Sequence, residues 1–78
     1  MDTNAIGKTI RTCRKEKKLT LEVLSGLAGI ARVHLCQIEL GYYYVPQLDT
    51  IFKIAHGLNM KPSTLVELID QAQKTEDD

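Results

Sequence analysis

Gly29 separates two short stretches of the 78-residue chain in which apolar residues recur at helical spacing. Glycine adopts the left-handed conformation that ends a helix at little cost, so we expect the first helix to end there. Thr20 is suited to cap the beginning of that helix, because its hydroxyl accepts a hydrogen bond from a free backbone amide. A further glycine, Gly41, stops the second helix. The sequence therefore predicts two short helices joined by a tight turn between residues 20 and 41.

A turn of this kind restricts the residues around it. A small residue is needed at Ser25, where the second helix crosses the first. Apolar residues are needed where the helices pack onto the rest of the domain, and the chain supplies Leu24, Leu27 and Ala28 before the turn, Ile30 in it, and Leu35 and Ile38 after it. Two short helices joined by three or four residues, with glycine in the turn, form a helix-turn-helix. The sequence predicts this motif.

Helical spacing accounts for the rest of the chain as well. The predicted helices cover about residues 4–18, 21–28, 32–40 and 48–57, with a fifth that begins near Pro62. The stretch YYYVP is a loop, since Pro46 disfavours helix at the residue before it. No segment alternates with the period of a strand, and none is repeated. We expect a single all-α domain over residues 1–78, a compact five-helix bundle ordered over about residues 4–72 with a polar tail at 73–78.

Size and composition exclude several classes of protein. Hydrophobic residues make up 44% of the chain and charged residues 26%, which is typical of a globular domain. A single small domain leaves little room for a deep substrate pocket. No run approaches the roughly 20 apolar residues of a membrane span, and the N-terminus lacks the basic and apolar regions of a secretory leader. With two cysteines only, we expect a cytoplasmic chain with reduced thiols.

The formal net charge of zero conceals an uneven distribution. The first 36 residues carry seven Lys or Arg against three Asp or Glu, whereas the last 42 carry three against seven. A basic half is compatible with a polyanionic partner, and it is equally compatible with an ordinary solvated surface.

Soft metal ligands and strong nucleophiles are few in this sequence. The candidates are Cys13, His34, Cys36 and His56. Cys13 falls at a core position of the first helix, and His34 and Cys36 lie about 200° apart around theirs, so these side chains do not converge. No Cys-x-x-Cys, His-x-x-x-His or glycine-rich phosphate loop occurs. We therefore expect neither an enzyme nor a bound metal or cofactor.

Three segments of the chain carry a family resemblance. IGKTIRTCRKEKKLT, QIELG and VPQLDTIFKIAHGLNM resemble the first helix, the end of the third and the fourth helix of the Cro/cI-type (XRE-like) helix-turn-helix family of phage repressors and bacterial regulators. The resemblance covers about residues 6–69. It implies a lambda-repressor-like bundle that binds double-stranded operator DNA, commonly as a homodimer, and hence a location on the nucleoid.

The resemblance also implies which residues read bases. The helix over about residues 32–40 would enter the major groove with its N-terminal residues against base edges. Arg32 would pair with guanine, Gln37 with adenine, and Val33 would touch a thymine methyl group. Cys36 flanks this face.

Phosphate contacts are expected from residues around the helix starts. The candidates are Lys18, Thr20, Leu21, His34, Tyr43 and Gln47. Leu21 stands where the family often has Gln, so only its backbone amide is available. His34 is alternatively a solvated side chain, and the tyrosines alternatively pack against the core or hold a partner. Ala31 departs from the family too, because Ser or Thr usually caps the recognition helix there.

Two further pairs have structural roles. In the family an Arg on the first helix bridges a Glu that ends the third, which here corresponds to Arg14 and Glu39. Val66 and Ile69 on the fifth helix are candidates for a subunit contact, and the alternative is that they complete the core of the monomer.

The function predicted from the sequence is therefore a sequence-specific transcriptional regulator that reads a palindromic operator as a homodimer. One alternative is a protein-interaction module, such as an antitoxin or adaptor, on the same fold. Another is a regulator that senses oxidation through Cys36.

Overall fold

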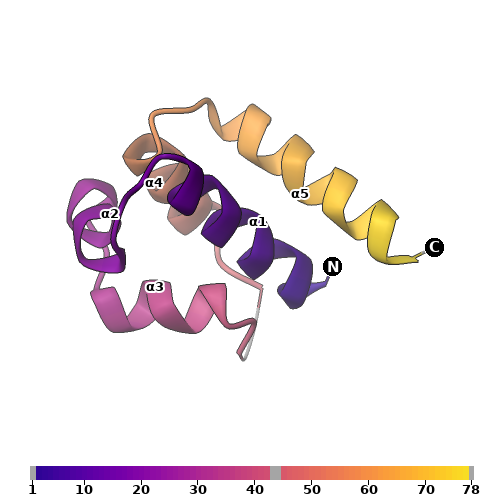
Figure 1. Ribbon diagram of the computed structural model, residues 1–78, viewed down its shortest axis with the longest axis horizontal. Helices are drawn as coiled ribbons and strands as arrows, with labels where there is room; N and C mark the ends of the chain where they lie inside the picture. The colour runs from indigo at the N-terminus through magenta and orange to yellow at the C-terminus, as the bar shows by residue number, and fades with distance from the viewer. Residues whose placement is uncertain (1, 43–44, 78) are drawn as a thin grey trace.

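Five helices follow one another along the residues that the computed structural model describes, 2–42 and 45–77. They are α1 (Thr3–Glu16), α2 (Leu21–Ala28), α3 (Arg32–Glu39), α4 (Leu48–Gly57) and α5 (Pro62–Asp77). These described residues contain no strand. The prediction of an all-α bundle of five helices is therefore confirmed. Figure 1 shows α1 in the middle of the molecule, between α3 on one side and α5 on the other.

Helix α1 is shorter at its C-terminal end than the sequence suggested. At its start, the carboxylate of Asp2 accepts a hydrogen bond from the amide of Asn4 at 2.9 Å. The helix ends at Glu16 rather than at residue 18, because Lys18 adopts a left-handed conformation with φ +59°. Its apolar face, which includes the fully buried Ile6 and Ile10, lies against the core.

The predicted turn between α2 and α3 is present. Thr20 Oγ1 accepts a hydrogen bond from the amide of Val23 at 3.1 Å, so this residue caps α2. Gly29 follows the helix with φ +73°, and its amide donates to the carbonyl of Ser25 at 2.9 Å. The two helices are bent by 112° relative to each other, within the usual range for a helix-turn-helix.

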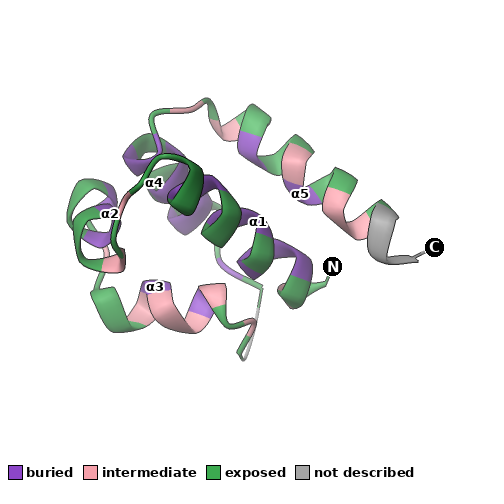
Figure 2. Cartoon of the chain, in the orientation of Figure 1, coloured by how far each residue is buried: buried purple, intermediate pink, exposed green. Residues whose placement is uncertain are grey.

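The core lies where the inward faces of all five helices meet, as the purple segments in Figure 2 show. It consists of Ile6, Ile10, Cys13, Leu24, Leu35, Ile38, Ile51, Ile54, Ala55, Leu58, Leu65 and Ile69. Leu27, which helical spacing placed on one face with Leu24 and Ala28, does not belong to it. Leu27 is 53% exposed, because α2 buries its Leu24, Ser25 and Ala28 side and Leu27 lies at the margin of that side. Leu48 is 67% exposed, since it precedes the buried turns of α4.

Helix α5 continues beyond the boundary expected from the sequence. Residues 73–77, which were assigned to a polar tail, are helical. Two interactions support this last part of the helix. The side chain of Gln73 accepts a hydrogen bond from the amide of Asp2 at 2.7 Å, and Lys74 lies 3.2 Å from Asp70 one turn earlier. The C-terminal half of α5 is thereby tied to the beginning of α1.

Candidate nucleic-acid interface

The outer face of α3 carries the predicted base-reading residues. Arg32, the first residue of the helix, is exposed, and Val33 is 63% exposed. Cys36 and Gln37 lie one turn further on and are half-buried. Residues four apart share a helical face, so these four side chains form one surface strip. The opposite side of α3 is anchored in the core by Leu35 and Ile38. The helix therefore presents this strip outward without exposing apolar core.

One ring nitrogen of His34, a predicted phosphate contact, is buried. Its ring is half-buried, and its Nε2 atom is inaccessible and has no hydrogen-bond partner among the described residues. In this orientation that nitrogen is turned toward the protein, where a phosphate has no access to it. The alternative of a fully solvated histidine does not match this burial.

A polar cleft of about 420 Å³ lies where the end of α1 and the beginnings of α2 and α3 meet. Its lining consists of Arg14, Lys18, Leu19, Thr20, Leu21, Glu22 and Arg32. It thus brings three of the predicted phosphate-contacting residues next to the first base-reading residue. The free amides at the beginning of α2 also lie here, and they favour an anion. Lys18 and Arg32 outnumber the one carboxylate of the lining, Glu22, since Arg14 is paired with Glu39, so the cleft suits a negatively charged backbone.

The remaining two phosphate candidates lie elsewhere. Gln47 is the N-cap residue of α4, is exposed, and makes no capping hydrogen bond with its side chain. Its amide group is therefore available to a ligand. Tyr43 lies outside the described residues.

Arg14 and Glu39 form the predicted pair. Arg14 Nε and Nη2 donate to the two carboxylate oxygens of Glu39 at 2.8 and 3.0 Å, and Nη1 donates to the carbonyl of Leu19 at 2.8 Å. The Arg14 side chain is 11% exposed and that of Glu39 is 5% exposed. The hydrogen bonds to Glu39 raise the pKa of Arg14 above its ordinary value, so the guanidinium stays charged. It fixes the C-terminal end of α3 to α1 beside the polar cleft.

An apolar surface that was not predicted from the sequence lies between α4 and α5. A groove of about 230 Å³ is lined by Ile6, Val45, Pro46, Leu48, Ile51, Val66 and Ile69. Val45, Leu48 and Val66 are between 43% and 67% exposed, and Phe52, one turn after Leu48, is 50% exposed. We call these four residues the apolar rim. The spacing of Leu48 and Phe52 indicates a second apolar face on α4, which is the pattern that could have revealed it.

The two candidates for a subunit contact differ in exposure. Ile69 is 4% exposed and belongs to the core, so the alternative that it completes the monomer is correct. Val66 is 45% exposed and remains accessible.

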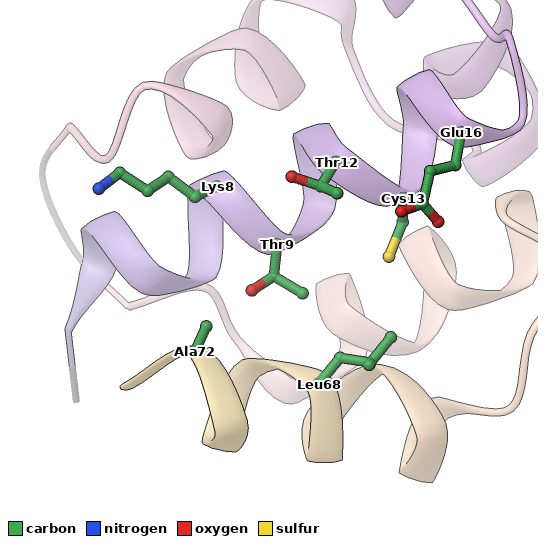
Figure 3. Close-up of a pocket in the computed structure, with 7 residues that line it drawn as sticks. All are labelled: Lys8, Thr9, Thr12, Cys13, Glu16, Leu68 and Ala72. Atoms are coloured by element: carbon green, nitrogen blue, oxygen red, sulfur yellow. The ribbon is translucent and has the colours of Figure 1, made fainter. Parts of the chain in front are cut away.

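A second groove, of about 280 Å³, runs between α1 and α5 (Figure 3). Thr9, Thr12 and Cys13 form its α1 side, and Leu68 and Ala72 form its α5 side. Burial, together with the nearby carboxylate of Glu16, raises the pKa of the Cys13 thiol. A protonated thiol is a poor nucleophile, so the groove contains no activated cysteine.

Metal-binding and membrane-spanning features are not found in the described part of the chain. No group of three or more His, Cys, Asp or Glu residues there is arranged to hold a metal ion. No single helix there is long and apolar enough to cross a membrane, and α2 and α3 meet the length requirement only as a sharply bent pair.

Comparison with protein families identifies a helix-turn-helix match over residues 10–65. Among curated proteins, the immunity repressor protein of Bacillus phage phi105 is 36% identical over 61 residues, which cover 78% of this chain and 42% of the repressor. The chain spans 42% to 63% of the length of the curated relatives it matches.

Two solved structures show the same arrangement of helices. The restriction-modification controller protein C.AhdI from Aeromonas hydrophila is 33% identical and superimposes with a TM-score of 0.76, over 82% of this chain and 96% of the controller. The regulator of biofilm formation SinR, in complex with DNA, is also 33% identical, with a TM-score of 0.72 over 78% of this chain and 97% of the SinR chain.

Proposed function

Because the chain belongs to the helix-turn-helix family, we propose that it is a sequence-specific DNA-binding transcriptional regulator whose α3 enters the major groove. The observation that carries the proposal is the outward strip of α3, with Arg32 and Val33 exposed at its N-terminal end. The related SinR structure contains DNA, and its chain shares this fold at 33% identity.

Base reading follows from the chemistry of the strip. The guanidinium of Arg32 matches the two acceptors of guanine, and the amide of Gln37 matches the donor and acceptor of adenine. Val33 offers an apolar contact to a thymine methyl group, with Cys36 beside it. Each well-formed bidentate pair contributes about 1–3 kcal/mol of discrimination between bases. Arg32 and Gln37 together therefore supply most of the expected sequence preference.

Phosphate binding follows from the polar cleft. Lys18, the capping residue Thr20 and the backbone amide of Leu21 surround it, and Gln47 supplies a contact at the start of α4. Such contacts set the register of the protein on the duplex but carry no sequence information. They also release counterions, so the logarithm of the association constant falls with the logarithm of salt concentration by about 0.9 per neutralised phosphate.

We further propose that two copies bind a palindromic operator through the apolar rim. Regulators of this type read half-sites about 34 Å apart, one turn of DNA. The chain measures 35 × 24 × 22 Å, so two copies side by side are large enough to span two such half-sites. The rim begins at Val45, only a short loop after α3, and it is self-complementary in its apolar chemistry.

Selection of bound duplexes from a random DNA pool tests the proposal. We expect enrichment of one palindromic sequence, with binding to it weakening steeply as salt is added. Enrichment of an asymmetric single site would contradict the proposed homodimer but remain consistent with a sequence-specific DNA-binding regulator. The absence of any enrichment would contradict DNA reading and favour the alternative, a protein-interaction module such as an antitoxin or adaptor.

A further inference from the structure

The C-terminal end of α3 rests directly on the backbone of α1 at Gly7. A Cβ atom added to Gly7 would lie 2.5 Å from the carbonyl oxygen of Ile38 and closer still to that of Glu39. Real Cβ contacts essentially never fall below 3.0 Å. Both atoms belong to the backbone of α3, so no side chain can rotate away to relieve the overlap. A methyl group at position 7 therefore requires α3 to move by at least half an ångström.

The substitution carries no other conformational penalty. Gly7 lies in the interior of α1 and has no positive φ, so alanine fits its backbone and favours helix by up to about 1 kcal/mol over glycine. The consequence of a Cβ atom at this position is thus confined to the distance between α1 and α3.

Two other contacts hold the same end of α3 against the same side of α1. The hydroxyl of Thr3 donates to the carbonyl of Gly41 at 3.1 Å, and Arg14 holds Glu39. Thr3, Gly7 and Arg14 are four and seven residues apart, so they fall within about 40° of one another around α1. This one stripe of α1 determines where the C-terminal end of α3 lies.

We infer that Gly7 is a positioning residue for DNA reading: its missing side chain sets the depth and tilt at which α3 presents Arg32, Val33 and Gln37. The inference rests on the proposed function, because it assumes that these residues read bases. A helix pivoted at one end moves the other, and hydrogen bonds to base edges tolerate only a few tenths of an ångström. Contacts to phosphates through flexible side chains and solvent are less sensitive to such a shift.

The test is Gly7→Ala, with affinities measured at one salt concentration for the selected operator and for a scrambled duplex. We expect the ratio of the two affinities to fall at least about tenfold, the equivalent of one bidentate base pair, while binding to the scrambled duplex stays within about twofold.

Two other glycines provide matched controls. A Cβ atom at Gly26 of α2 would meet nothing within 4 Å, so Gly26→Ala should leave both affinities unchanged. A Cβ atom at Gly57 would lie 2.9 Å from Leu24 Cδ1, at the packing of α4 on α2, so Gly57→Ala should lower the melting temperature yet preserve the ratio. The inference is overturned if Gly57→Ala lowers the ratio of operator to scrambled-duplex affinity as much as Gly7→Ala does, or if Gly7→Ala leaves this ratio unchanged.

A milder variant covers the case in which Gly7→Ala does not fold. Thr3→Val removes the hydrogen bond to Gly41 and keeps the branched shape. We expect it to lower the ratio several-fold relative to Thr12→Val, the same change at an exposed position of α1 away from α3. Equal ratios in the two variants contradict the inference. A wild-type chain without preference for any duplex overturns the proposed function as well, so the two failures are distinguishable.

Discussion

The guanidinium of Arg14 donates hydrogen bonds of 2.8 and 3.0 Å to the two carboxylate oxygens of Glu39, which lies 25 residues away in the sequence. The third nitrogen of the same guanidinium, Nη1, donates a hydrogen bond to the carbonyl of Leu19, just after α1. One side chain thus joins the end of α1, the approach to α2 and the end of α3. Because both partners are largely buried, either one left alone becomes an uncompensated charge.

Glu39→Ala should therefore lower stability and DNA affinity together. Removal of one partner of a buried pair costs about 3 kcal/mol, and the freed end of α3 loses its fixed position. Chemical denaturation and operator binding measure the two effects. Asp70→Ala, which removes an exposed pair with Lys74 on α5, should change stability by less than about 1 kcal/mol and leave binding intact. Lost binding at an unchanged melting temperature would show that Glu39 acts on DNA directly.

Arg32→Gln should change the preferred base at one symmetric position of the operator. Arg32 is exposed and outside the core, so the fold is expected to be unaffected. The loss of one bidentate pair corresponds to about 1–3 kcal/mol for the original operator. A repeated duplex selection with the variant measures the new preference. Lys61→Gln, which also replaces an exposed cation by an amide but at the residue before α5, should preserve the preference. An unaltered preference in Arg32→Gln would place the base-reading register elsewhere on α3.

Leu48→Glu should separate the proposed dimer and leave the monomer folded. The Leu48 side chain is 67% exposed in the single chain, so the charge is costly only when a second copy covers it. Sedimentation equilibrium measures the change in oligomeric state, and circular dichroism checks the fold. Leu27→Glu places the same charge on another exposed leucine, on α2 and outside the lining of the apolar groove, and should leave association unchanged. Equal association of Leu48→Glu and wild type excludes this surface as the interface.

Ala31→Ser should stabilise α3. Ala31 is the N-cap residue of that helix, has the extended conformation typical of a cap, and makes no capping hydrogen bond. A serine hydroxyl supplies the missing acceptor, and the expected gain is about 0.5–1 kcal/mol. Thermal or chemical unfolding measures it. Ala31→Val, which offers no side-chain acceptor and ranks with alanine at this position, should not reproduce the gain.

The pH dependence of unfolding should reveal the buried thiol of Cys13. Its pKa is raised in the folded chain above the ordinary value of 9.0, so the thiol ionises first in the unfolded chain as the pH rises. The contribution to stability is fully present below pH 9.0 and is lost as the pH rises toward the folded pKa. Compared with Cys13→Ala, the wild-type free energy of unfolding should fall more steeply above pH 9. Parallel slopes would show that the folded thiol titrates normally.

Local chemistry accounts for the features that could be predicted from the sequence. The left-handed Gly29 and the Thr20 cap each depend on residues close in the chain, and each lies where the pattern indicated. The pair of Arg14 and Glu39 is distant in sequence and came from family resemblance, which carries tertiary information that periodicity lacks.

The features that could not be predicted depend on how helices cross. Helical spacing marks an apolar side but not its edges, which is why Leu27 was placed on one face with Leu24 and Ala28 although it is 53% exposed. The contact between Gly7 and the backbone of α3 forms only when the two helices pack together. The only sign of it in the sequence is a glycine at a core-facing position of α1. The burial of His34 Nε2 likewise arises from neighbours that the sequence does not place.

The way in which α3 is held has a practical consequence. Leu35 and Ile38 on the inner side and Glu39 at the C-terminal end anchor the helix. Arg32 and Val33 do not belong to the core. The outer residues can therefore be randomised as a cassette while the frame that carries them is left untouched. A combinatorial library at those few codons, screened against chosen duplexes, would turn one small scaffold into a collection of reprogrammed binders.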